Sequence, residues 1–412
     1  MRRRTLLSLG GAAVLPVPLS GAAAAGGRRR WIHTWTAMPQ LTEPHNLPPA
    51  PFTGESAVLV DTTLRQTVHV TVGGPRVRVR FSNAFGGAAL PLTAAAVARP
   101  VGGRAGVPAI VSGSSRSLTF GGRPSVTVPV GAQIVSDPVP LPAGRGENLT
   151  VTVYLATGQA TLDLTSHPGS RTTSYLVGGD QHAAPDLPGA VGVAHWYLLS
   201  GVEVESDAPA LAIVGDSLTD GRGSTTDGND RWPDQLFARA PRAAVLNQAA
   251  GGNRVLNDGL GPNVLARLDR DVLATSGVDR MLLFEGVNDI GTAPATVADQ
   301  KAVTDDLLVA YEQIVLRAHA ADLRVYGATI TPFGGNTGYD DPGGLREASR
   351  TAVNAAIRRR GLFDGVADFD AAVRDPAVPR QLLPAYDTGD HLHLNPAGYR
   401  AIAQAVPQRW LN

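Results

Sequence analysis

Three side chains of this 412-residue sequence could together activate a hydroxyl group for attack on a carbonyl carbon. Ser217 lies in the glycine-flanked segment 215–221, directly after an apolar run. Asp390 and His393 come just before 395–396, an Asn-Pro pair that suits the start of a helix. Asp390 can accept a hydrogen bond from one ring nitrogen of His393, and the other nitrogen can take the serine proton. The pattern predicts a serine nucleophile with a histidine base, although Ser217 alone is as typical of a turn or helix cap.

Two further segments could supply hydrogen-bond donors to the same place. The segment 247–253 ends in Gly251-Gly252-Asn253 after an apolar run, and Asn288 lies in 286–291 after another. Glycine lets a backbone N–H approach a ligand closely, and the carboxamide of Asn288 can donate from its NH₂ group. The alternatives are a plain strand-to-helix turn for the first segment and a helix cap for the second.

The surrounding pattern predicts the elements that would position these residues. From residue 207 onwards, apolar strand runs alternate with helical periodicity, which is typical of parallel βαβ units in a doubly wound sheet. The expected strands are 211–214, 243–246, 281–284 and 324–330, and the expected helices are 232–240, 298–321, 345–360 and 396–410. Ligands of such sheets bind beyond the carboxyl ends of the strands, where all the reactive segments fall.

The part before residue 207 has a different pattern. It contains short alternating runs between turn residues and almost no helical periodicity, so we expect an all-β sandwich, jelly-roll-like, over 26–206. The runs 63–72 and 76–81 flank a Gly-Gly-Pro segment and predict an antiparallel hairpin.

With these four segments in this order, residues 207–412 resemble the GDSL, or SGNH, hydrolase superfamily. The resemblance implies a three-layer α/β/α fold that hydrolyses esters, with Ser217 as nucleophile, His393 as base and Asp390 as its orienting partner. It also implies an oxyanion hole made of the N–H groups of Ser217 and Gly252 and the side chain of Asn288, although Gly251 is adjacent and could donate instead. Segments 31–39, 78–86 and 231–233 are similar to actinobacterial secreted esterases that carry a β-domain ahead of the hydrolase domain.

Composition excludes several other classes of function. The chain has no cysteine, and its 36 basic residues balance 36 acidic ones. A thiol nucleophile, cysteine-bound metals and an electrostatic attraction to nucleic acid are therefore not expected. Lys301 is the only lysine and falls on an expected surface helix, which disfavours lysine chemistry.

A metal site is conceivable at Asp387, Asp390, His391 and His393. Two histidines one residue apart in an extended loop point to opposite sides, however, which is poor geometry for binding one ion. We expect no metal and no cofactor.

The first residues predict export. Segment 1–25 begins with three arginines after Met1, continues with a short apolar stretch and ends in four alanines, the pattern of a secretory or twin-arginine signal. No other stretch is long and apolar enough for a membrane span, so we expect a secreted protein without stable membrane insertion. The oligomeric state is left open.

The expected partner is an ester substrate, carbohydrate or lipid. Loop 331–344 follows a strand end, and its Phe333 and Tyr339 could contact that substrate or belong to an irregular connection. The chain shows no long apolar lid, so short-chain or acetyl esters of carbohydrates are the first expectation. A lysophospholipase or general carboxylesterase is the alternative, and a non-catalytic carbohydrate-binding protein is a further one. Hydrolysis and acyl transfer to an alcohol are not distinguished by these residues.

Overall fold

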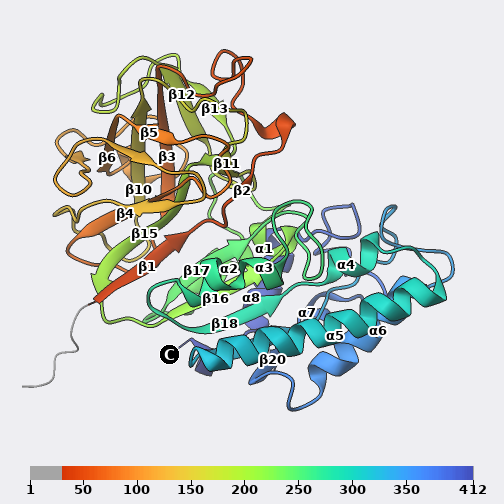
Figure 1. Ribbon diagram of the computed structural model, residues 1–412. Helices are drawn as coiled ribbons and strands as arrows, with labels where there is room; N and C mark the ends of the chain where they lie inside the picture. Colours follow the sequence, from red (N-terminus) through yellow and green to blue (C-terminus); the bar gives the residue numbers. More distant parts are fainter. Residues whose placement is uncertain (1–29, 412) are drawn as a thin grey trace, which may run out of the picture.

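The computed structural model describes residues 30–411, and the predicted signal 1–25 lies outside them. Figure 1 shows two parts joined at about residue 207: antiparallel sheets up to Ser206, called here the β region, and a parallel sheet with helices from Ala210, called the α/β region. This arrangement confirms the predicted fold class. Within the described range, no helix is long and apolar enough to cross a membrane.

The β region is built from antiparallel sheets that face each other across an apolar core of alternating side chains such as Leu64, Val68, Val77 and Val79. Its largest sheet has the order β13–β12–β3–β10–β6–β7, and a second has the order β1–β15–β4–β9. Smaller sheets are β14–β11–β2 and β5–β8. The strands are β1 (Arg30–Thr36), β2 (Gln40–Leu41), β3 (Thr62–His69), β4 (Val77–Ser82), β5 (Leu90–Leu92), β6 (Ala94–Ala98), β7 (Arg116–Ser117), β8 (Val126–Val128), β9 (Gln133–Val135), β10 (Asn148–Leu155), β11 (Thr165–His167), β12 (Ser174–Gly178), β13 (Val191–Val193), β14 (Trp196–Tyr197) and β15 (Leu199–Ser206).

The predicted hairpin between residues 63–72 and 76–81 is wrong. Both segments are strands, but β3 pairs with β10 and β12, whereas β4 pairs with β15 and β9 in the other sheet. The Gly-Gly-Pro segment crosses from one sheet to the other, passing so close to neighbouring backbone that a Cβ on Gly73 would lie 2.5 Å from the carbonyl oxygen of Ala143. The glycines therefore serve close packing and not a tight turn.

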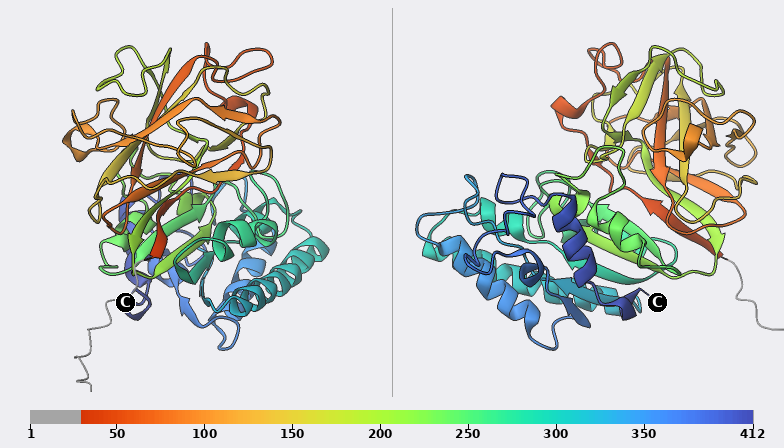
Figure 2. Two further views of the ribbon diagram at one scale, coloured as in Figure 1. Left: turned by 60° about the vertical axis from the view of Figure 1, so that its left-hand side comes forward. Right: turned by 180° about the vertical axis from the view of Figure 1, so that it is seen from behind.

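The α/β region has five parallel strands in the order β17–β16–β18–β19–β20. The views from the front and from behind place helices such as α5 and α8 on opposite faces of this sheet, which makes three layers (Figure 2). The strands are β16 (Ala210–Gly215), β17 (Ala244–Ala249), β18 (Val278–Phe284), β19 (Arg324–Ala328) and β20 (Gly365–Ala367). The helices are α1 (Ser217–Asp220), α2 (Trp232–Phe237), α3 (Val264–Leu268), α4 (Val287–Thr292), α5 (Val297–Ala320), α6 (Leu345–Arg358), α7 (Phe369–Val373) and α8 (Pro396–Ala405).

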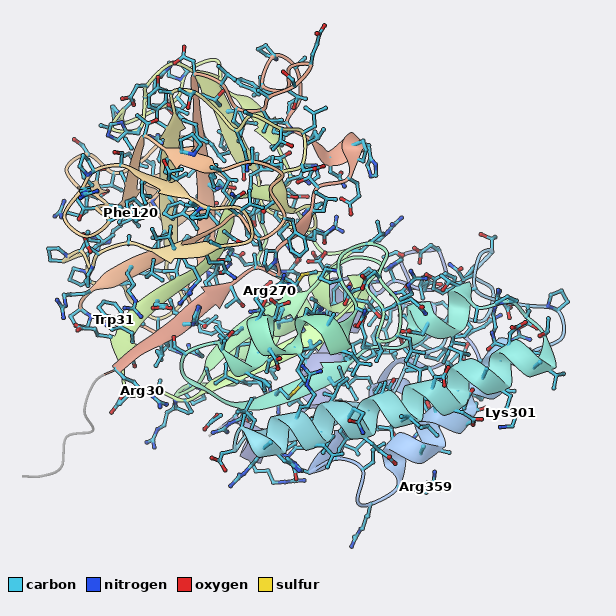
Figure 3. The ribbon with its side chains drawn as sticks, in the orientation of Figure 1. Arg30, Trp31, Phe120, Arg270, Lys301 and Arg359 are labelled. Carbon is cyan, nitrogen blue, oxygen red and sulfur yellow. The ribbon has the colours of Figure 1, made fainter. Side chains whose placement is uncertain are left out.

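The two parts pack directly on each other. Strand β1 lies against the edge strand β17, where the hydroxyl of Thr36 donates to the carbonyl oxygen of Asn247 at 3.0 Å. Figure 3 shows Arg270 at this junction, where its guanidinium donates to the carbonyl oxygen of Pro39 at 3.3 Å. Lys301, by contrast, projects from α5 as predicted, with its side chain 74% exposed and paired with Asp305.

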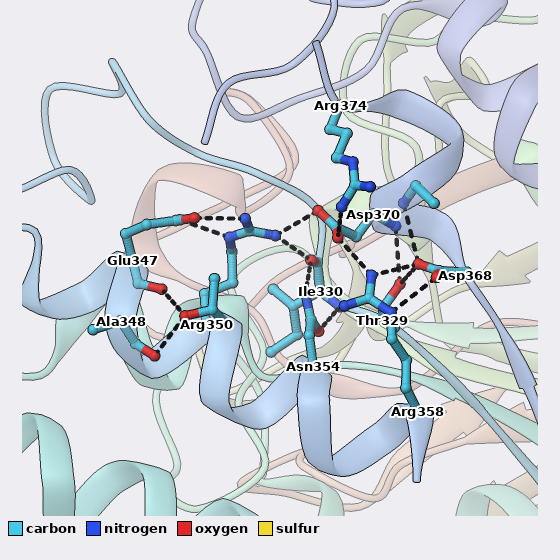
Figure 4. A network of polar contacts seen from close by, with 12 residues as sticks. Thr329, Ile330, Glu347, Ala348, Arg350, Asn354, Arg358, Asp368, Asp370 and Arg374 are labelled. Atoms are coloured by element: carbon cyan, nitrogen blue, oxygen red, sulfur yellow. Dashed lines mark hydrogen bonds and ion pairs between the residues drawn. The ribbon is translucent and has the colours of Figure 1, made fainter. Parts of the chain in front are cut away.

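A buried ionic network fixes the end of β19, from which loop 331–344 departs (Figure 4). Arg350 of α6 donates to the carbonyl oxygen of Ile330 at 3.0 Å and to Asp370 at 2.7 Å. Asp370 also accepts from Arg358 and Arg374. The side chains of Arg350 and Asp370 are 3% and 4% exposed, so a buried ion pair holds the chain at Ile330, just before the loop.

Candidate active site

The end of β16 places the predicted nucleophile at the edge of the sheet. The strand stops at Gly215, and the carboxylate of Asp216 accepts from the N–H of Leu218 at 2.9 Å, which caps the single turn of α1. Ser217 is the first residue of this turn, so its own N–H has no partner within the helix. The side chain stays close to the surface, at 8% exposure of the residue.

The structure brings the three predicted reactive side chains together. Ser217 Oγ lies 2.8 Å from Nε2 of His393, and Nδ1 of His393 lies 2.6 Å from Oδ2 of Asp390. The Asp–His pair belongs to the loop before α8, whose first turn is capped by Asn395 as predicted. Because an ionised Asp390 can only accept, Nδ1 of His393 carries a proton and Nε2 is free to take the proton of Ser217.

The electrostatics of the pair suit this exchange. Burial lowers the pKa of His393, an effect that Asp390 opposes and that the nearby Arg222 and Arg171 reinforce, so the ring is neutral near neutral pH. Burial alone would raise the pKa of Asp390, but hydrogen bonds from the N–H and the ring of His393 outweigh it and lower this pKa to about 2. Asp390 is therefore ionised and ready to stabilise an imidazolium.

The loop after β17 contains the predicted oxyanion donor, and the structure distinguishes its two glycines. The N–H of Gly251 donates to Oδ2 of Asp220 at 3.1 Å. Gly252 has a φ of 72°, in the left-handed region that favours glycine, and a Cβ there would lie 2.4 Å from Leu260. Within residues 30–411, the N–H groups of Gly252 and Ser217 donate to no other backbone group. Gly252 is thus the glycine whose N–H is available to a ligand.

Asn288 lies at the start of α4 with its carboxamide fixed at both ends. Nδ2 donates to the carbonyl oxygen of Asn253 at 2.8 Å, and Oδ1 accepts from the hydroxyl of Tyr339 at 2.6 Å. The carbonyl oxygen of Asn253 can only accept, so the NH₂ group of Asn288 must face it, and the flipped orientation of the amide is excluded. Among the described residues, the carbonyl oxygen of Asn253 is the one acceptor of Nδ2, so its second hydrogen is available to a ligand.

Loop 331–344 acts differently from the sequence expectation. Phe333, expected as a possible substrate contact, is 1% exposed and belongs to the apolar core of the α/β region. Tyr339 packs edge-on against it at 6.3 Å and is half-buried, with its hydroxyl bound to Asn288. Phe333 therefore supports Tyr339, and Tyr339 positions the amide of Asn288.

Further residues that the sequence did not single out hold the same loop. Asp289 accepts from the N–H groups of Val255 and Leu256, each at 2.9 Å. Arg267 donates to Oδ1 of Asn253 at 3.0 Å. The only local signal was the position of Asp289 beside Asn288, which suggested a helix cap. Arg267 gave none, because its partner lies in another element.

The second histidine of the loop before α8 is separate from this site. His391 is exposed and binds Asp387 through Nδ1 at 2.8 Å, while His393 binds Asp390. In the part of the chain that the structure describes, no group of three or more histidine, aspartate or glutamate side chains is placed to hold a metal ion.

A serine–histidine–aspartate chain with amide donors, at the carboxyl end of a parallel three-layer sheet, is the arrangement that serine hydrolases use. Residues 213–401 match the GDSL-like Lipase/Acylhydrolase family. This part of the chain is thus a GDSL-like lipase/acylhydrolase domain, and the protein is an ester-hydrolysing enzyme of this type.

Solved structures give a weaker likeness. One is a GDSL-like lipase from Bacteroides thetaiotaomicron, 16% identical, covering 48% of this chain and 86% of that chain with a TM-score of 0.36. Another is a catalytic mutant of an acetylxylan esterase from Geobacillus stearothermophilus, 21% identical, covering 48% and 92% with a TM-score of 0.36. No curated protein sequence matches the chain.

Proposed function

We propose that the protein is a secreted serine esterase that cleaves carboxylic esters through an acyl-enzyme, with short-chain or acetyl esters of carbohydrates as its substrates. The observation that carries the reaction is the hydrogen-bonded chain from Ser217 Oγ through His393 to Asp390, at 2.8 and 2.6 Å.

Each step follows from these atoms. His393 Nε2 takes the proton of Ser217 as Oγ bonds to the ester carbon, and the carbonyl oxygen becomes an oxyanion held by the N–H groups of Ser217 and Gly252 and by Asn288. When the C–O bond to the alcohol breaks, the imidazolium returns the proton to the leaving oxygen. Water then attacks the acyl-serine with the same base, releasing the acid and restoring Ser217 Oγ–H.

The short-chain preference rests on the aromatic residues of loop 331–344. The aromatic side chain offered by loop 331–344 is Tyr339, whose hydroxyl is engaged by Asn288, and Phe333 is buried. Loop 331–344 therefore offers a polar tyrosine and not an apolar surface, which favours a short acyl group. Trp35 and Trp196 are buried against each other in the β region at 4.8 Å, so they do not serve as sugar platforms.

The test has two parts. Wild type should hydrolyse p-nitrophenyl acetate and react covalently with a fluorophosphonate, and Ser217→Ala should do neither; activity retained in Ser217→Ala would refute the assignment. A panel of p-nitrophenyl esters of rising chain length, lysophospholipids and acetylated polysaccharides then addresses the substrate. Highest kcat/KM on lysophospholipids would favour the alternative, and transfer of the acetyl group to an added alcohol would indicate an acyltransferase.

Export is supported by the pattern of segment 1–25 alone. The full chain expressed in a host with both export routes should reach the medium or periplasm with its N-terminus processed within the alanine-rich end of this segment. Replacing Arg2 and Arg3 by lysine should block export if the twin-arginine route is used. An unprocessed N-terminus on protein found only in the cytoplasm would contradict the proposal.

A further inference from the structure

The contacts between the β region and the active site converge on one carboxylate. Asp220 is the last residue of α1, the turn that begins with Ser217, and it is 1% exposed. Its Oδ1 lies 2.8 Å from Nε2 of His167 in β11, and its Oδ2 accepts from the N–H of Gly251 at 3.1 Å. One side chain therefore links the turn of the nucleophile, the loop of the oxyanion donor and the β region.

Both ring nitrogens of His167 are engaged in hydrogen bonds. Nδ1 lies 3.0 Å from the carbonyl oxygen of Met38, which can only accept, so Nδ1 carries a proton. Nε2 lies 2.8 Å from Oδ1 of Asp220, so one proton is shared between the ring and the carboxyl group. The contact is buried, because the ring of His167 is 4% exposed and is stacked on Trp196 at 5.7 Å.

The chain around His167 is shaped for this contact. A Cβ on Gly169 would lie 1.6 Å from Oδ2 of Asp220, so only glycine allows the two segments to approach. Farther along, Asp227 donates its N–H to the carbonyl oxygen of Arg171 at 2.9 Å and accepts from the N–H and the hydroxyl of Thr173 at 2.7 and 2.9 Å. Segments 167–173 and 220–227 thus form one continuous contact.

We propose that His167 is a positioning residue of the active site, which makes the β region part of the catalytic apparatus. His167 holds the carboxylate of Asp220 in place, and Asp220 fixes the N–H of Gly251. With that amide fixed, the next one, of Gly252, is the one presented to the oxyanion. This inference rests on the proposed esterase mechanism, because it concerns the geometry of the oxyanion hole.

Loss of His167 should act on the transition state more than on substrate binding. Without its partner, Asp220 keeps only the N–H of Gly251 and the charge of the buried Arg231, so its carboxylate either moves toward water or stays as a less compensated negative charge near the developing oxyanion. Both outcomes weaken a donor that matters only once the oxyanion forms, and such a loss lowers kcat with little change in KM.

The experiment compares variants of the full chain on p-nitrophenyl acetate. His167→Leu should lower kcat by about tenfold or more, which corresponds to roughly 1.4 kcal/mol of transition-state stabilisation, with KM changed much less. His167→Gln keeps an amide donor for Asp220 and should recover most of the loss. The matched control is Arg145→Ala, which removes a contact of the same interface, to the carbonyl oxygen of Ala240 at 2.9 Å, and should lower the melting temperature without lowering kcat.

A second variant keeps the proposal testable if His167→Leu does not fold. Asp220→Leu has nearly the same shape but no acceptor atom, so the N–H of Gly251 loses its partner and kcat should fall here too. Wild-type kcat in folded His167→Leu, or in folded Asp220→Leu if His167→Leu does not fold, would overturn the inference. It would also be overturned if His167→Gln did not restore kcat and Arg145→Ala lowered kcat as much as His167→Leu does. Failure of the esterase proposal itself is distinguishable, because the wild type would then be inactive on every ester.

Discussion

The hydroxyl of Tyr339 offers the sharpest test of how the oxyanion hole is held. Tyr339→Phe removes one hydrogen bond, the 2.6 Å contact to Oδ1 of Asn288, and leaves the ring packed on Phe333. Losing a buried hydrogen bond and leaving its acceptor unpaired costs about 1–2 kcal/mol. If this free energy is lost from the stabilisation of the transition state by the Asn288 amide, kcat should fall by about 5- to 30-fold with KM nearly unchanged.

Asn288→Ala sets the upper limit for this effect. Removing an oxyanion donor altogether typically lowers kcat by about 10²–10³. The double variant Tyr339→Phe with Asn288→Ala should be no worse than Asn288→Ala alone, because the hydroxyl acts only through that amide. Tyr197→Phe is the matched control, since its buried hydroxyl binds the carbonyl oxygen of Asn46 at 2.7 Å, in the β region.

The assay is steady-state hydrolysis of p-nitrophenyl acetate, with circular dichroism and thermal melts to establish folding. Two results would refute the reasoning. One is a wild-type kcat in folded Tyr339→Phe. The other is additive losses in the double variant, which would mean that Tyr339 reaches the substrate independently of Asn288.

Three further predictions concern charge. The mechanism needs neutral His393, and its pKa is lowered, so kcat/KM should rise with pH in a limb whose midpoint lies below 6.5. Arg222→Gln removes a charge that lowers this pKa and should move the midpoint to higher pH. An unchanged midpoint would show that Arg222 does not act on the ring. Asp390→Asn should lower kcat less than His393→Ala does, and equal losses would contradict its role as an orienting partner. Asp370→Ala leaves Arg350, which is 3% exposed, without one of its partners, and should lower the free energy of unfolding by about 3–5 kcal/mol. The control is Arg374→Ala, which removes an exposed partner of Asp370 and should cost less than about 1 kcal/mol. Urea titrations measure both values.

The positions of the reactive residues could be predicted because each lies beside a strand end or a helix start that the local sequence indicates. Ser217 and Asn288 directly follow strands, and His393 precedes a helix with a clear cap, so the topology of a parallel sheet brings them to one edge. The strands and long helices of the α/β region were placed within a few residues, although helix 396–410 ends at Ala405 and β20 was missed, since three residues carry little periodicity.

What the sequence could not provide depends on contacts between distant segments. The pairing of β3 and β4 with different sheets is decided by packing, and two alternating runs with a glycine connection look the same in a hairpin and in a crossover. His167 lies 53 positions before Asp220, in another region, and nothing in its neighbourhood indicates a partner. The choice between Gly251 and Gly252 likewise needed the position of Asp220.

Two carboxyl groups close to the Ser217–His393 pair have pKa values that their surroundings shift in opposite directions. Asp390 is partly exposed and accepts from the N–H groups of Leu392 and His393 as well as from the ring, so its pKa falls to about 2. Asp216 is fully buried, which raises its pKa to about 7, with Asp289 and Asp220 adding to the effect of burial.

In the proposed mechanism, negative charge is useful beside His393 and harmful beside the oxyanion. An ionised Asp390 stabilises the imidazolium of His393, whereas an ionised Asp216, next to the N–H of Ser217, would repel the oxyanion. The folded-state pKa of Asp216 is raised, so its contribution to stability is present below its unfolded value and is lost as pH rises through about 7. Asp216→Asn keeps the cap oxygen and removes this titration, so its stability should depend less on pH between about 4 and 7 than that of the wild type, as urea unfolding at several pH values would measure. An identical pH dependence in the two proteins would mean that Asp216 is ionised in the native state and that the oxyanion hole works beside a permanent negative charge.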